Sequence, residues 1–102
     1  MATGEPIVVI LSQDMADLVP LFLAQRNKDL STLRTALPVS DFEAMRRVGH
    51  GMAGAGASYG LDHISVLGDQ LVVAARAGDV ATLGQLLREL EDYLSRLTVK
   101  YL

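Results

Sequence analysis

Residues 42–60 read FEAMRRVGHGMAGAGASYG, and two signals in this stretch disagree. Four glycines precede the closing Gly60, and each costs a helix roughly 0.5–1 kcal/mol relative to alanine. Apolar and small residues nevertheless recur at the spacing of one helix face: Phe42, Met45, Gly49, Met52, Gly56 and Tyr59. Because this periodicity continues through the glycines, we predict a helix in which the glycines serve packing or access. A conflict between local propensity and overall pattern is typical of a functional site.

One histidine lies in this stretch on the face opposite the apolar residues. At about 100° per residue, the apolar set spans a sector of about 100°, and His50 falls roughly 145° from its centre. We therefore expect His50 to face solvent. Arg46 and Arg47 share this outward side within about one turn before the histidine, whereas Gly54 and Ala57 leave the surface after it almost bare.

The rest of the chain continues the helical pattern, with Pro38, Gly60 and Gly78 between the periodic segments rather than inside them. Three further amphipathic stripes are Leu23, Leu30, Leu33 and Leu37; Leu61, Ile64, Leu67, Leu71 and Ala74 or Ala75; and Val80, Leu83, Leu87, Leu90, Leu94, Leu97 and Tyr101. Each stripe can bury its apolar side against the others. Helices joined by short turns therefore account for most of the chain.

The pattern predicts an all-α fold, an up-down-up-down antiparallel four-helix bundle with a short extra N-terminal helix. It forms a single domain over residues 1–102, with bundle helices over about 20–37, 40–59, 62–77 and 79–98. Ahead of the bundle we expect an extended strap over residues 1–11. A short helix over 12–19 follows, which Pro20 separates from the first bundle helix.

Polar residues at the expected helix starts support these boundaries. Ser40 and Glu43 have the spacing of a capping box ahead of the second bundle helix. Asp79 is the expected N-cap of the last helix, and Ser12 that of the short N-terminal helix.

Composition excludes several functional classes. The chain has 102 residues and no cysteine, which excludes disulfides, thiolate metal sites and a cysteine nucleophile and favours a cytoplasmic protein. The longest apolar run, residues 7–11, is far shorter than the roughly 20 residues that span a bilayer, so we expect neither membrane insertion nor secretion. With a net charge of −3 and scattered basic residues, no nucleic-acid partner is expected. We expect a monomer that binds other proteins.

A solvent-facing histidine beside cations has the properties of a phosphoryl acceptor. Such an acceptor needs a neutral imidazole, a nitrogen that can be reached in line, and nearby positive charge to stabilise the added anion. An exposed histidine alone is more often an ordinary solvated residue, and this is how we interpret His63. The arginines and glycines around His50 set it apart.

The residues from His50 onward resemble the His-x-Leu/Met-Lys-Gly signature of histidine-containing phosphotransfer (HPt) domains. The matching segments are His50-Gly51-Met52-Ala53-Gly54, the helix start Asp41-Phe42-Glu43-Ala44, and the turn Arg76-Ala77-Gly78-Asp79. The resemblance implies a helical bundle that relays phosphoryl groups between receiver-domain aspartates in two-component signalling, as an intermediate rather than a turnover enzyme. It also implies that His50 becomes the phosphohistidine.

The same resemblance implies which partners and cofactors to expect. The partners are a response-regulator receiver domain, a hybrid histidine kinase, or both. The chain has no cofactor or metal of its own, and magnesium is expected in the partner receiver domain.

Two positions depart from the family pattern. Ala53 stands where lysine is usual, three residues after the histidine, and Val72 stands where some members have a glutamine near the site. Candidates for stabilising the phosphoryl group or docking a partner are Arg46, Arg47, Gly51, Ala53, Gly54, Ala57 and Arg76, the last at a position where some members are basic. The alternative interpretation is an HPt-like adaptor that binds receiver or kinase domains without phosphotransfer.

Other kinds of site fit the sequence poorly. Gly54, Gly56 and Gly60 suggest a dinucleotide-binding loop, but that loop follows a buried strand, and here a helix precedes it. Two separated histidines without a third ligand make a poor metal site, and no carboxylate pair is placed for acid-base catalysis. An unrelated helical dimerisation module would need a second exposed apolar stripe, whereas the last helix has one clear stripe.

Overall fold

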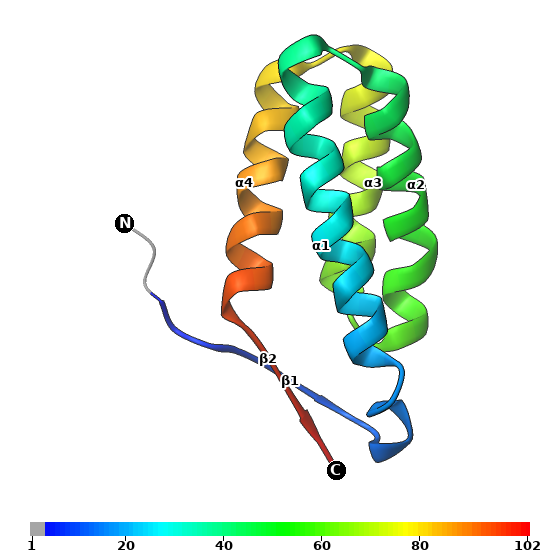
Figure 1. Ribbon diagram of the computed structural model, residues 1–102, viewed down its shortest axis with the longest axis vertical. Helices are drawn as coiled ribbons and strands as arrows, with labels where there is room; N and C mark the ends of the chain where they lie inside the picture. The colour runs from blue at the N-terminus through cyan, green and yellow to red at the C-terminus, as the bar shows by residue number, and fades with distance from the viewer. Residues whose placement is uncertain (1–3) are drawn as a thin grey trace.

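The computed structural model describes residues 4–102, in which four helices stand side by side and alternate in direction (Figure 1). They are α1 (Val19–Ala36), α2 (Phe42–Gly56), α3 (Asp62–Ala77) and α4 (Val80–Arg96). Two short strands, β1 (Ile7–Leu11) and β2 (Leu97–Tyr101), pair in parallel near one end of the bundle. The predicted four-helix bundle is confirmed, and the strand pair is an addition that the sequence pattern did not predict.

The termini of three helices follow the expected local chemistry, with one correction. The Asp79 carboxylate accepts a hydrogen bond from the Thr82 N–H at 3.1 Å and caps α4, as predicted. Gly78, with φ of +62°, ends α3 in the left-handed conformation that glycine adopts without strain. The predicted capping box is wrong, because Asp41 rather than Ser40 caps α2 by accepting from the Ala44 N–H.

Ser40 and Glu43 do not form the reciprocal hydrogen bonds of a capping box. Ser40 closes the 3-10 turn Leu37–Val39 with a φ of +54°, so its side chain is not in the N-cap position. Glu43 pairs with Arg46 rather than reaching back to the start of the helix. At its other end, α2 is shorter than predicted, because residues 57–59 form a 3-10 turn that Gly60 ends with a φ of +73°.

The predicted helix over 12–19 is also wrong. Only Gln13–Met15 forms a 3-10 turn, which Ser12 caps by accepting from the Asp14 N–H. Pro20 does not separate two helices; it lies in the first turn of α1, where a missing N–H has no helical partner to lose. The strap becomes strand β1, and residues 1–3 of that prediction lie outside the described residues.

The last helix ends earlier than its stripe suggested. Leu97 has a ψ of 126°, so the backbone is extended from there to Tyr101. Residues 97, 99 and 101 are half-buried while 98 and 100 are exposed, an alternation of period two that belongs to a strand. Pairing with β1, from Ile7 beside Leu97 to Leu11 beside Tyr101, supplies the hydrogen bonds that a continuing helix would have made.

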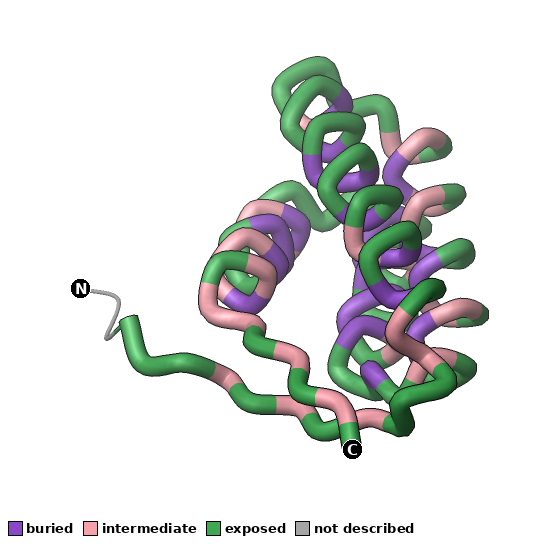
Figure 2. Tube along the Cα trace, turned by 60° about the horizontal axis from the view of Figure 1, so that its bottom comes forward, coloured by how far each residue is buried: buried purple, intermediate pink, exposed green. Residues whose placement is uncertain are grey.

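The core lies on the bundle axis, where the buried segments of the helices face one another (Figure 2). Its fully buried members include Leu33, Met45, Met52, Ile64, Leu67, Leu71, Leu83 and Leu90, all of them in the predicted stripes. The α4 stripe was partly misplaced, because Leu86 and Tyr93 are buried and Val80 remains 47% exposed. No helix of the described chain is long and apolar enough to cross a membrane.

Candidate functional site

Glycine brings α2 and α3 into backbone contact. A Cβ atom added to Gly68 of α3 would lie 2.4 Å from the Ala53 nitrogen, and one added to Gly49 would lie 2.8 Å from the Gly68 carbonyl oxygen. Farther along, a Cβ on Gly56 would lie 2.6 Å from the Ser65 Oγ. Side chains of any size would push the helices apart at these points. We call this contact between Gly49 and Gly56 of α2 and Gly68 of α3 the glycine seam. The seam fixes the rotation of α2 and directs the opposite side of the helix to solvent.

His50 lies at the middle of α2 and is exposed, as predicted. Its ring makes no hydrogen bond or ion pair with any other residue of the described chain. A Cβ added to Gly51 or Gly54 would meet no atom within 4 Å, and Ala57 is exposed one turn farther on. A partner can therefore approach the imidazole across a strip that carries almost no side-chain atoms.

Arg46 and Arg47 lie on the other side of His50, toward the start of α2. Arg46 holds Glu43 through two hydrogen bonds, Nη2 to Oε1 at 2.6 Å and Nε to Oε2 at 3.0 Å. These bonds, with further attraction from Arg47, lower the pKa of Glu43 below its usual value. The Arg46 guanidinium therefore reaches back toward Glu43, away from His50.

Arg76 lies in the last turn of α3, level with the first turn of α2, where Gly78 stands beside Phe42. The helix runs antiparallel to α2, since Gly49 contacts residues 68–72 and Gly56 contacts residues 61–65. Arg76 is exposed in the last turn of α3 and has no hydrogen bond or ion pair within residues 4–102. Because its side chain leans toward the N-terminus of α3, it extends toward the level of His50.

The two positions that depart from the expected signature lie at the seam. Ala53 is half-buried, with its backbone nitrogen against Gly68. Val72 is also half-buried, and its nitrogen is 3.0 Å from the Cβ position of Gly49. Neither side chain supplies charge or a hydrogen bond to His50.

One residue that shapes this site was missed at the sequence level. Gly68 makes the closest approach of the seam and thereby determines how far Ala53 and His50 stand from α3. A glycine inside an otherwise apolar helical stripe was the available signal, because it indicates close backbone packing. Among the described residues, no cluster of three His, Cys, Asp or Glu side chains could hold a metal ion.

The family model of the Hpt domain matches residues 17–99, from just before α1 into strand β2. The chain belongs to the Hpt domain family. No curated protein and no solved structure matches it. This match confirms the family that the sequence predicted, and Hpt membership implies histidine phosphotransfer in phosphorelay signalling. Hpt domains act as phosphotransfer intermediates and interact with receiver domains or kinases.

Proposed function

We propose that this Hpt domain relays a phosphoryl group between the aspartates of receiver domains, with His50 as acceptor and donor. The observation that carries the proposal is the exposed, unbonded ring of His50 beside the open positions of Gly51 and Gly54. A phosphoryl group can be transferred only if the acceptor nitrogen reaches phosphorus in line with the leaving oxygen. A surface cleared of side chains meets that requirement for a protein-bound donor.

The transfer step follows from the chemistry of the imidazole. The lone pair of one ring nitrogen attacks the phosphorus of the aspartyl phosphate in the partner receiver, and a nitrogen–phosphorus bond forms. The bond from phosphorus to the aspartyl oxygen breaks, and the electron pair leaves with the carboxylate. The reverse sequence passes the group to a second receiver. The partner receiver is expected to supply the magnesium ion.

We assign Arg76, rather than Arg46, as the cation that compensates for the missing lysine at Ala53. Arg46 is engaged by Glu43, and its side chain leans away from His50. Arg76 is exposed and forms no ion pair within the described chain, and the N-terminal lean of helix side chains directs it along α3 toward the level of His50. Charge-assisted contacts between guanidinium and phosphoryl oxygens would then stabilise the phosphorylated state.

Ala53 also supports a second candidate function, that of an adaptor. In this alternative the chain docks receiver or kinase domains but does not accept the phosphoryl group, because positive charge beside His50 is too weak. The open strip would then serve binding alone.

Incubation with a phosphorylated receiver domain and Mg²⁺ distinguishes the relay from the adaptor. The relay predicts transfer of the phosphoryl label to this chain in the acid-labile form that phosphohistidine shows. Stable binding to several receivers without transfer from any of them would contradict the relay and support the adaptor.

The role of Arg76 is tested in the same assay with Arg76→Gln. We expect the transfer rate to fall about tenfold, the loss of about 1.4 kcal/mol of transition-state stabilisation. Arg88→Gln, which removes an exposed cation of α4, is the matched control and should leave the rate unchanged. A larger loss in Arg46→Gln than in Arg76→Gln would transfer the role to Arg46.

A further inference from the structure

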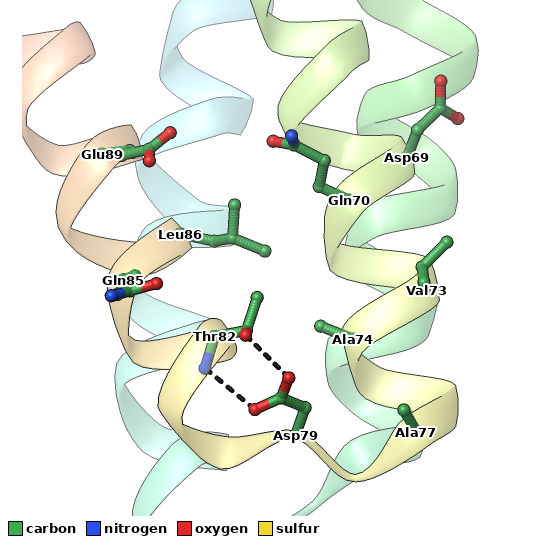
Figure 3. A pocket seen from close by; sticks show the side chains of 10 residues that line it. All are labelled: Asp69, Gln70, Val73, Ala74, Ala77, Asp79, Thr82, Gln85, Leu86 and Glu89. Atoms are coloured by element: carbon green, nitrogen blue, oxygen red, sulfur yellow. Dashed lines mark hydrogen bonds between the residues drawn. The ribbon is translucent and has the colours of Figure 1, made fainter.

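A groove separate from the His50 surface runs between α3 and α4. It has a volume of about 470 Å³ and is lined by about two turns of each helix (Figure 3). Gly68 and Val72 turn the opposite side of α3 toward α2, whereas Gln70, Ala74 and Ala77 line the groove. The floor of the groove therefore lies on the side of α3 that faces away from α2 and His50.

The floor of the groove is apolar and made of small side chains. Ala74 and Leu86 point into it from opposite helices in Figure 3, and Ala77 lies at its lower end. Val73 stands at the edge of the groove and is 70% exposed, although it is a large aliphatic residue. Such a floor offers contact area to aliphatic side chains of another molecule.

The edge of the groove is negatively charged. Three carboxylates line it, those of Asp69, Asp79 and Glu89. The Asp79 carboxylate accepts hydrogen bonds from the Thr82 N–H at 3.1 Å and from the Thr82 Oγ1 hydroxyl at 2.7 Å. Asp69 and Glu89 form no hydrogen bond or ion pair with other residues of the described chain. No Lys, Arg or His from residues 4–102 lines the groove. Arg88 lies beside Gly84 and lines two neighbouring hollows, one toward α1 and one that it shares with Gln85 and Glu89.

We infer that this groove docks a helical segment of a partner protein that carries an apolar stripe flanked by lysines or arginines. Residues 69–77 of α3 extend over about 12 Å, which matches about two turns of a partner helix. Leucine-sized side chains at helical spacing would contact Val73, Ala77 and Leu86, while the basic flanks would face Asp69 and Glu89. Arg47, which is exposed beside His50 and forms no ion pair within residues 4–102, would repel the same segment, so charge favours the groove over the phosphotransfer surface.

Two synthetic helical peptides of about 14 residues with the same leucine stripe test this inference. One has lysines and the other glutamates beside the stripe, and binding to the ¹⁵N-labelled chain is followed by NMR. We expect the lysine peptide to shift amide signals of residues 69–77 and 82–89 and to leave those around His50 unchanged. His50→Gln should bind it equally, so the result does not depend on phosphotransfer.

Charge reversal at the edge sharpens the test. Asp69→Lys/Glu89→Lys should weaken the lysine peptide about tenfold and enable the glutamate peptide to bind. Asp14→Lys/Asp17→Lys makes the same change in net charge on exposed residues outside the groove, and it should retain binding of the lysine peptide. Equal loss in the two double variants would overturn the inference in favour of diffuse attraction. Equal binding of a lysine peptide with serines in place of the leucines, or signal changes around His50, would overturn it as well.

Discussion

The glycines of α2 form two pairs that look alike in sequence and differ completely in the fold. Gly49 and Gly56 lie against α3, where an added Cβ would come within 2.8 Å and 2.6 Å of neighbouring atoms. Gly51 and Gly54 face open space, where the same added carbon would meet no atom within 4 Å apart from its chain neighbours and the backbone of its own helix. The first pair permits two helices to touch, and the second clears the surface around His50. One residue type therefore serves packing and access within the same helix.

The exposed pair carries the stronger functional argument. Gly49 and Gly56 offset their poor helix propensity by allowing close packing with α3. Gly51 and Gly54 have the same unfavourable propensity and gain no contact in return. In the proposed relay, access for a partner to His50 explains why α2 tolerates them.

The close glycine contact between α2 and α3 predicts that Gly68→Ala destabilises the fold. The added Cβ would lie 2.4 Å from the Ala53 nitrogen, and backbone atoms cannot move aside without shifting a helix. We expect the free energy of unfolding to fall by about 1–3 kcal/mol, measured by urea denaturation. An unchanged midpoint in Gly68→Ala would show that α2 and α3 are not held in backbone contact.

On the exposed side, Gly54→Leu should slow phosphotransfer while the fold stays intact. Leucine one turn after His50 leans toward the N-terminus of the helix and so covers the approach to the ring. We expect the rate of transfer from a receiver to fall about tenfold, with no loss of thermal stability. Ala81→Leu, on an exposed part of α4, is the control and should transfer normally. Full activity in Gly54→Leu would mean that the bare strip is not the docking surface.

The smallest effect is expected for Gly51→Ala, two residues away from Gly49 in the same helix. Alanine fits the open space at Gly51 and improves helix propensity, so stability should rise by about 0.5–1 kcal/mol. The measurement is the denaturation midpoint of Gly51→Ala. The midpoint of Gly49→Ala, measured in the same way, should be lower than that of the wild type. If both variants shifted in the same direction, the division of the glycines into two classes would fail.

The helical bundle could be predicted because four apolar stripes and their caps agree with one another. Burial of Met45, Met52, Ile64 and Leu71 on the predicted faces shows how reliable that periodicity is. The strands could not be foreseen from the same pattern, since Leu97 and Tyr101 continue the helical spacing of α4 by chance. Their extended conformation depends on pairing with β1, which lies 90 residues earlier in the chain at Ile7.

The candidate site was only partly accessible from sequence. The outward direction of His50 follows from helix geometry alone. The different roles proposed for Arg46 and Arg76 could not be assigned from sequence, because they depend on the Glu43 ion pair and on the direction of a neighbouring helix. The role of Gly68 is a tertiary contact between two helices, which single-helix periodicity does not report.

The most direct test of the central claim is the location of the phosphoryl group after transfer. A phosphorylated receiver, Mg²⁺ and the wild-type chain are mixed, and the labelled residue is identified by mass spectrometry under conditions that preserve phosphohistidine. The relay predicts label on His50 and none on the His50→Gln variant, which retains His63. Label that persists in His50→Gln, or that resides on His63 in the wild type, would contradict it.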